Sequence, residues 1–342
     1  MDTGVVALPA IDARTSVTED RPMRAVVVGE CLIELVRTGA DTMTTHPAGD
    51  TFNTASMLAR ASRALDSPME VSYRTGLGDD PLSGTIATAL RDHGLVDASV
   101  RLPGRACGLY LLDGSTGDMW YWRGDSAARE LFHGEDWLPD GAAPDLVFLS
   151  LITLQQMSEH ARDLAADWVG GIRGGGGTIA FSANHRAAGW PSSAAAAAEA
   201  ARFAARADLV FASAADCEAL FGTAGVEAAL ESLGRLGAGE AIVTAGEDGA
   251  SVSAGGARLD VPAVTPARDA RGAVDATGAG DAFAGAYLAW RSAGRPPEDA
   301  ARAAVRVASQ TVTFVGALPR PEAAEWSAMD ELLSELARAP RA

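Results

Sequence analysis

The sequence predicts an α/β fold in which a mostly parallel β-sheet lies between two layers of helices and carries a small antiparallel β lid. Two observations support this class. Short apolar runs alternate along the chain with segments whose apolar residues recur three and four positions apart, an order typical of right-handed βαβ crossovers. Residues 100–125 break this order with two aromatic-rich segments joined by a turn sequence, which favours a hairpin.

The first part of the core follows in order along the chain. The run "MRAVVVG" from Met23 is β-branched and ends at a glycine, as expected of a buried first strand. Apolar residues at helical spacing predict a helix over Phe52–Leu65, directly after the loop "AGD". The segment "VSYRTGLGDD" is typical of a strand followed by a glycine-rich turn, and "LSGTIATALRDHG" indicates the next helix.

The second part of the core alternates in the same way. The predicted elements are a strand at 145–150, a helix at 154–172, a strand at 177–183, a helix at 192–206, a strand at 208–213, a helix at 216–221 and a strand at 240–246. The glycine run at 173–178 precedes a strand and opens no helix. We therefore interpret it as a connection and not as a phosphate-binding loop.

Composition narrows the functional classes. The chain has 342 residues, 48% of them hydrophobic, which is enough for a sizeable core in one large or two modest domains. A net charge of -17 disfavours binding to nucleic acid or to an anionic membrane surface. Three widely separated cysteines and five scattered histidines indicate neither a disulfide framework nor a metal site, so we assign no metal ligand and expect a cytoplasmic protein.

The ends of the chain are expected to lie outside the core. Residues 1–22 show no helical or strand period and no signal-peptide pattern, so we predict a disordered tail, with Met23 as a candidate start. The expected organisation is a core domain at 23–330 with its lid from about 31–47 and 100–125, and a C-terminal tail at 331–342.

The segment "VDATGAGDAFAGAYLAW" carries the strongest chemical signal. Its small residues end where a helical apolar pattern begins, which places the amides of Gly278, Ala279 and Gly280 at a helix N-terminus, a favourable site for an anion. Asp281 in the first turn would repel a bound phosphate, yet a carboxylate there suits a base that takes a proton from an attacking hydroxyl.

Simpler interpretations of this segment stay open. Asp281 could cap the helix, and the glycines could form only a tight strand-to-helix turn. Two common nucleotide motifs do not fit: a Walker A sequence is absent, and Phe283 occupies the third glycine position of a dinucleotide-binding fingerprint.

Several ordered motifs resemble one family. "DATGAGDAF" resembles the signature D-T-x-G-A-G-D of the ribokinase-like (PfkB) carbohydrate kinases, and "RTGLGDDPLSG", "GECLIEL" and "AGDTFNTA" resemble its N-terminal motifs. "GLYLLDGSTGDMWYWRGDSAA" and "ASQTVTFVGALPR" resemble the 2-keto-3-deoxygluconate (KDG) kinases in particular. The likeness covers roughly residues 23–325. It implies a ribokinase-like fold and transfer of the ATP γ-phosphoryl group to a hydroxyl of a sugar or sugar acid, with KDG favoured.

The resemblance also implies roles for individual residues. Asp281 matches the catalytic base, and Gly278, Ala279 and Gly280 match the anion hole. The matching nucleotide-side residues are Ser213, Asp216, Thr244, Gly246, Gly249 and Asp275. Mg²⁺ is implied by the nucleotide chemistry rather than by visible ligands. A structural role is the alternative for Asp275, which could orient its loop, and for the glycines, which suit a tight turn.

Substrate-side residues are implied in the same way. They are Gly49, Asp50, Asn53, Tyr110, Tyr121, Arg123 and Arg186. In KDG kinases the residues that match the two arginines and the two tyrosines meet the sugar acid, and an arginine can offer two parallel N–H bonds to a carboxylate. Helix capping by Asp50 and simple packing of the tyrosines are the structural alternatives.

Two motifs depart from the family pattern. Ser182 stands where the KDG kinases have an acid and Ala187 where proline is usual, and Ser213 with Asp216 replaces the family's N-x-x-E. These changes leave two alternatives open: a kinase for a neutral ketose or a nucleoside, and a sugar-binding relative without turnover. The expected partner is a small sugar or sugar acid, and the exposed strand edge of the lid suggests a homodimer.

Overall fold

The computed structural model describes residues 21–37, 39, 41–112, 119–266, 275–313, 316–319 and 323–340. The predicted hairpin turn at 113–118 and all but two residues of the predicted tail at 1–22 lie outside this range. The described end of that segment is tied to the core, because Arg21 forms an ion pair with Asp145 at 2.7 Å.

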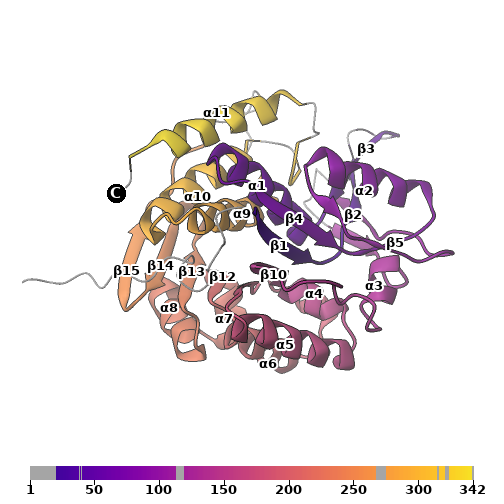
Figure 1. Ribbon diagram of the computed structural model, residues 1–342, viewed down its shortest axis with the longest axis horizontal. Helices are drawn as coiled ribbons and strands as arrows, with labels where there is room; N and C mark the ends of the chain where they lie inside the picture. Colours follow the sequence, from indigo (N-terminus) through magenta and orange to yellow (C-terminus); the bar gives the residue numbers. More distant parts are fainter. Residues whose placement is uncertain are drawn as a thin grey trace, which may run out of the picture.

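A sheet of nine strands forms the centre of the described structure (Figure 1). In spatial order the strands are β15 (Ala257–Val261), β14 (Ala250–Ala254), β13 (Glu240–Thr244), β12 (Leu209–Ser213), β11 (Thr178–Ser182), β10 (Leu146–Ser150), β1 (Met23–Val28), β4 (Met69–Arg74) and β6 (Val96–Asp97). The pairs from β13 to β6 are parallel, and β14 and β15 add antiparallel strands at one edge. The predicted parallel α/β core is confirmed.

Helices cover both faces of this sheet (Figure 1). One layer holds α1 (Asp50–Ala64), α2 (Pro81–Asp92), α9 (Ala279–Ser292), α10 (Pro297–Thr311) and α11 (Ala324–Arg338). The other holds α4 (Leu151–Gln156), α5 (Glu159–Gly174), α6 (Ser193–Ala204), α7 (Ala214–Phe221) and α8 (Gly225–Leu236), and α3 (Ala127–Leu131) also packs in this layer. Each layer has its own apolar core, because the alternate side chains of every strand point to opposite faces.

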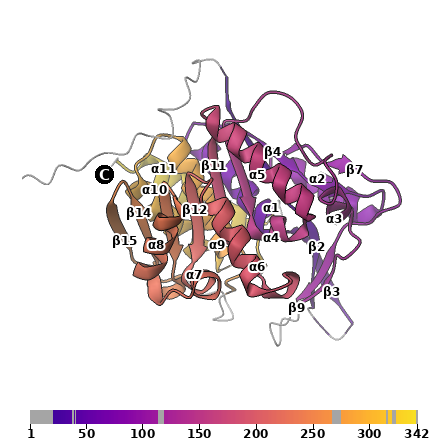
Figure 2. The ribbon, with the colours of Figure 1, turned by 90° about the horizontal axis from the view of Figure 1, so that it is seen from below.

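The lid is a separate sheet of four strands at one end of the molecule (Figure 2). Its order is β3 (Met43–Ala48), β2 (Leu32–Arg37), β8 (Leu109–Leu112) and β9 (Met119–Trp122). The two outer pairs are antiparallel, whereas β2 and β8 run parallel. Residues 100–101, predicted as part of the lid, form β7 (Val100–Arg101), which pairs with β5 (Gly76–Leu77) in a small parallel sheet.

Two of the differences from the predicted boundaries have a clear physical cause. The single helix predicted at 154–172 is broken at Met157 and Ser158, because the Ser158 hydroxyl accepts a hydrogen bond from the Ala161 N–H and caps a new helix. The predicted tail from 331 is largely helical, because α11 continues to Arg338 and buries Leu333. None of the described helices is long and apolar enough to cross a membrane.

Candidate active site

Two helix N-termini meet beneath the lid. α1 and α9 pack closely because Gly285 has no side chain: a Cβ there would lie 2.6 Å from the carbonyl oxygen of Thr54. This crossing sets the start of α1 beside the start of α9. As a result Asn53 reaches Asp281, a residue 228 positions away, and donates a hydrogen bond of 2.8 Å from Nδ2 to Oδ2.

Asp281 occupies the first turn of α9 without capping the helix. The N-cap is Gly278, and the carboxylate accepts its hydrogen bond from Asn53. Burial raises the pKa of the Asp281 carboxyl to about 7, and the charge of Asp50 adds to the rise, whereas the Asn53 hydrogen bond and the Arg186 charge oppose it. The residue keeps some contact with solvent, but the surrounding protein atoms desolvate its carboxyl.

The amides around Asp281 are in part free. The first helical bond of α9 runs from the Ala282 N–H to the Gly278 carbonyl, so among the described residues the N–H groups of Gly280 and Asp281 have no carbonyl partner. Ala279 differs from the prediction, because its N–H is directed to the Ala276 carbonyl at 3.2 Å. A Cβ on Gly280 would meet only open space. The arrangement leaves room for an anion beside the Asp281 carboxylate.

The turn before α9 is held by Asp275. Its two carboxylate oxygens accept hydrogen bonds from the Thr277 and Gly316 N–H groups, each at 2.9 Å. Gly278 is required in this turn, because its φ is 75° and a Cβ would lie 2.7 Å from that of Ala317. These contacts match the structural alternative for Asp275, in which the carboxylate orients the loop.

Asp50 and Gly49 lie at the start of α1. Asn184, just beyond β11, donates a hydrogen bond of 3.3 Å to the Asp50 carboxylate. The N-cap is Gly49, whose φ of 153° and close approach to the Glu30 carbonyl exclude a Cβ. The Oδ1 atom of Asn53 is buried without a hydrogen-bond partner among the described residues, so an acceptor is left for a ligand hydroxyl.

The lid presents a polar face that includes an acid the sequence analysis did not single out. The Tyr110 hydroxyl donates a hydrogen bond of 2.7 Å to Glu34, and the Tyr110 ring stacks on Tyr121 at 5.5 Å. Burial raises the pKa of Glu34, which is 1% exposed, and it likewise raises the pKa of Tyr110, with a contribution from the charge of Asp281. The sequence signals for Glu34 are an acid within the otherwise apolar run "LIEL" and its position in the motif "GECLIEL".

The two arginines that the resemblance singled out lie in different surroundings. Arg123 forms an ion pair of 2.5 Å with Glu30 and lies over the Tyr121 ring. Arg186 is exposed, and its backbone carbonyl accepts a hydrogen bond of 2.7 Å from Gln155. Its charge acts on Asp281, so Arg186 belongs to the surroundings of the acid.

The nucleotide-side residues lie at the carboxyl ends of neighbouring parallel strands. Ser213 of β12 is aligned with Thr244 of β13. Ser213 and Asp216 form a capping box at the start of α7, and Asp216 also accepts a hydrogen bond from the His185 N–H. These contacts match a structural role for the pair, although the strand ends are where α/β sheets bind ligands.

The two predicted glycines on the nucleotide side, Gly246 and Gly249, belong to the turn between β13 and β14. Both have positive φ values, 57° and 98°. A Cβ at Gly249 would meet the Val261 carbonyl oxygen at 2.1 Å, whereas one at Gly246 would meet open space. The tight turn therefore explains Gly249, and only Gly246 faces free volume.

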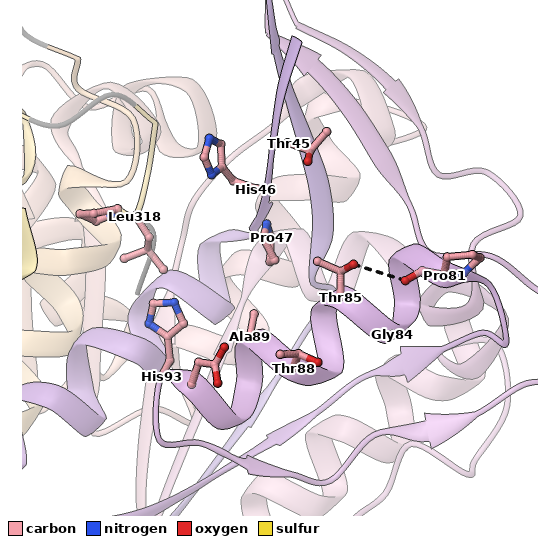
Figure 3. Close-up of a pocket in the computed structure, with 12 residues that line it drawn as sticks. Thr45, His46, Pro47, Pro81, Gly84, Thr85, Thr88, Ala89, His93 and Leu318 are labelled. Atoms are coloured by element: carbon pink, nitrogen blue, oxygen red, sulfur yellow. Dashed lines mark hydrogen bonds between the residues drawn. The ribbon is translucent and has the colours of Figure 1, made fainter. Parts of the chain in front are cut away.

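A groove of about 450 Å³ lies elsewhere, between β3, α2 and the segment 318–319 (Figure 3). His46, Thr45, Thr85 and Thr88 lie along its sides, and none of the predicted site residues lines it. Among the described residues, no group of three or more histidine, cysteine, aspartate or glutamate side chains is placed to hold a metal ion.

An α/β core with a β lid, and a desolvated carboxylate beside free helix N-terminal amides, define a phosphotransferase of the sugar-kinase class. Comparison with known proteins agrees with this class. Residues 23–323 match the pfkB family of carbohydrate kinases. The chain therefore belongs to the pfkB family and is a carbohydrate kinase.

Individual relatives extend this result. The chain is 33% identical over 309 residues to the 2-dehydro-3-deoxygluconokinase of Escherichia coli K12, which covers 88% of this chain and 98% of that protein. The fold is similar to that of aminoimidazole riboside kinase from Salmonella enterica complexed with aminoimidazole riboside and an ATP analog. The TM-score is 0.76 and the identity 23%, and the match covers 91% of this chain and 100% of that kinase. A putative ribokinase II from E. coli in complex with ATP and Mg²⁺ gives the same TM-score of 0.76, with 19% identity. The match covers 92% of this chain and 99% of that protein.

Proposed function

We propose that this kinase transfers the γ-phosphoryl group of ATP to the terminal hydroxyl of KDG, the compound also called 2-dehydro-3-deoxygluconate. The observation that carries the proposal is the position of Asp281, a desolvated carboxyl hydrogen-bonded by Asn53 beside the free amides of α9. The identity to the E. coli 2-dehydro-3-deoxygluconokinase supports the choice of substrate.

Asp281 acts as general base in this reaction. Its carboxylate takes the proton of the acceptor hydroxyl while that oxygen forms a bond to the γ-phosphorus and the bond to the leaving ADP oxygen breaks. The N–H groups of Gly280 and Asp281 hold the charge on the transferred phosphoryl oxygens. A base with a pKa of about 7 is matched to this task, because it is ionised in a large share of molecules near neutral pH yet still basic.

Polar groups around the acid recognise the sugar. The buried Oδ1 of Asn53 accepts a hydrogen bond from a sugar hydroxyl, and Asp50 takes another. Tyr110 and Tyr121 form the lid wall, and the two arginines supply positive charge for the carboxylate of a sugar acid. Lid closure over the sugar excludes water, which would otherwise compete for the γ-phosphoryl group.

ATP binds along the carboxyl ends of β12 and β13, with its phosphates directed to the N-terminus of α9. The open space at Gly246 and Gly280 suits a ligand that approaches the backbone closely. Mg²⁺ accompanies the nucleotide and neutralises charge on its phosphates. Asp275 and Asp216 already accept hydrogen bonds from backbone amides, so either carboxylate would contact the metal through water rather than directly.

A second candidate function is the phosphorylation of a neutral ketose or a nucleoside. One observation favours it: Arg123 already has a carboxylate partner in Glu30, so it has less need of an acidic substrate. Only Arg186 would then remain to attract an acidic substrate, so the preference for sugar acids over neutral sugars would be weak.

A coupled ADP-release assay with ATP and Mg²⁺ tests these functions. The panel is KDG, its epimer 2-keto-3-deoxygalactonate, fructose, ribose and adenosine, with Asp281→Asn as the control. We expect turnover on the keto acids, reduced by about 10²–10⁴-fold in the control, the usual range for a general base. Turnover on neutral substrates alone would select the second candidate, and binding of sugar without turnover on any substrate would indicate a non-catalytic relative.

We further propose that the lid edge forms a homodimer. β9 is one of the two edge strands of the lid, and all four of its side chains, Met119, Trp120, Tyr121 and Trp122, are 43–56% exposed. A strand edge with unpaired backbone groups and large apolar side chains favours association with a second copy.

A further inference from the structure

Three lid strands bring their functional side chains onto one face. The register aligns Glu34 of β2 with Tyr110 of β8, and Tyr110 with Tyr121 of β9. Arg123 directly follows β9, and its guanidinium lies over the Tyr121 ring, 5.8 Å from the ring centroid. Its Cβ lies 3.2 Å from where a Cβ of Gly108 would be. The face that carries the two tyrosines therefore continues along the lid to Arg123.

Glu30 reaches Arg123 across Gly108, where the absence of a side chain leaves room for the Glu30 carboxylate. A Cβ on Gly108 would lie 2.6 Å from Oε1 of Glu30 and 3.2 Å from the Cβ of Arg123. Any larger residue at 108 would displace the Glu30 carboxylate. Glycine at this position thus opens the path by which Glu30, two residues beyond β1, contacts Arg123, the residue that follows β9.

The Glu30 carboxylate is fixed from its other side. The Ser126 hydroxyl donates a hydrogen bond of 2.6 Å to Oε1, and the same hydroxyl accepts the Arg129 N–H as the N-cap of α3. The Glu30 side chain is only 2% exposed. Its second oxygen, Oε2, lies 2.5 Å from Nη2 of Arg123.

Glu30 balances the charge of the Arg123 guanidinium, but some of the N–H groups of this guanidinium have no hydrogen-bond acceptor among the described residues. The Nη2 contact with Glu30 is an ion pair without a well-directed hydrogen bond, and the buried Nε has no hydrogen-bond partner among the described residues. Buried N–H donors without acceptors cost free energy, so they call for a partner outside the protein, which can be a water, an ion or a ligand. An arginine presents its N–H groups in a planar fork that matches a carboxylate.

We infer that Glu30 is a positioning residue that holds Arg123 on the inner face of the lid and leaves its remaining donors to a carboxylate of the substrate. The inference rests on the proposed function, because it assigns Arg123 to the acid group of a sugar acid. Glu30 balances the buried arginine while the site is empty, and it fixes the direction of the guanidinium before the substrate arrives. On this inference the ion pair with Glu30 prepares Arg123 to bind the substrate carboxylate, whereas the second candidate function takes the pair as a reason why Arg123 does not bind it.

The test is a double-mutant cycle on the full chain with Glu30→Gln, Arg123→Gln and the double variant. The kcat and KM for KDG and the KM for ATP are measured. KDG binding without ATP is followed by tryptophan fluorescence, because Trp120 and Trp122 lie in β9, the strand that Arg123 follows. Glu130→Gln is the matched control, because Glu130 pairs with Arg105 in an exposed ion pair close by in the sequence.

We expect Glu30→Gln to raise the KM and the dissociation constant for KDG by roughly tenfold, with the KM for ATP little changed. The thermal midpoint should fall, because the variant leaves the guanidinium of Arg123 without its counter-charge. Arg123→Gln should have the larger effect, and the double variant should match it, because Glu30 acts only through Arg123. The inference would be overturned if the two substitutions raised the KM for KDG independently, so that their effects multiplied in the double variant. An unchanged KM for KDG in Glu30→Gln would overturn it as well. Failure of the proposed function is distinct, because wild-type protein would then not phosphorylate KDG at all.

Discussion

At the scale of single residues, the chemistry depends on how the surroundings of Asp281 set its pKa. The acid is desolvated and lies near the charge of Asp50, and both effects raise its pKa toward 7. Asn53 and Arg186 oppose the rise. With a pKa near 7, the carboxyl is basic enough to take a proton and is still ionised in a large share of molecules at neutral pH. A general base requires both properties.

This balance predicts a pH dependence. Because the base must be ionised, kcat/KM for the sugar should rise about tenfold per pH unit below pH 7 and level off above it. Arg186→Gln removes a charge that lowers the pKa of Asp281, so the inflection should move to higher pH, apart from any change in KM. Rates at saturating ATP between pH 5.5 and 9 measure both effects. An inflection that stays fixed in the variant would contradict the assigned role of the Arg186 charge.

The same pKa shift predicts a cost in stability. The folded pKa of Asp281 lies above its unfolded value, so the folded state binds the proton more tightly, and the free energy of unfolding falls as pH rises from about 4 to 7. Asp281→Asn removes this loss. Its thermal midpoint should exceed that of wild type by roughly 2–5 °C at pH 8, with a smaller difference at pH 5. Calorimetry at the two pH values decides, and a difference that grows toward low pH would refute the argument.

At the scale of elements, the site is assembled by helix starts and strand ends. The close crossing of α1 and α9 brings Asn53 to Asp281, and the far end of α9 is anchored by a buried ion pair between Arg291 and Glu240 of β13. The loop after β11 is positioned differently, by the neighbouring helix α4. Gln155 of α4 donates to the Arg186 carbonyl, and Gly189 packs directly against its side chain.

Gln155 is therefore expected to hold the loop that carries Arg186. Gln155→Ala removes the hydrogen bond and the packing surface, which should let the loop move and raise the KM for KDG by about fivefold, the equivalent of roughly 1 kcal/mol. The KM for ATP should stay constant and serves as the internal control. Steady-state kinetics make the comparison, and a fall in kcat with unchanged KM for KDG would show that Gln155 does not act on substrate binding.

At the scale of the whole molecule, the parallel core was predictable because each buried strand is a continuous apolar run. The break at Met157 and Ser158 was not, because the apolar spacing continues through it and only the serine N-cap of α5 marks it. Glu30 and Glu34 were missed for a related reason. Their partners lie far along the chain, Tyr110 of β8 76 residues after Glu34 and Ser126 at the start of α3 96 residues after Glu30, which no local pattern reveals.

The lid also sets the last prediction, which concerns assembly. Trp120 and Trp122 alternate with Tyr121, so they lie on the face opposite the one that stacks on Tyr110 and are free to contact a second copy. Light scattering should give twice the chain mass of 35.1 kDa for wild type. Trp120→Glu with Trp122→Glu places like charges at the paired edges and should yield the monomer. Glu231→Gln, at an exposed position of α8 and outside the lid, is the control. A monomeric wild type would rule out the dimer, and a dimeric double variant would move the interface to another surface.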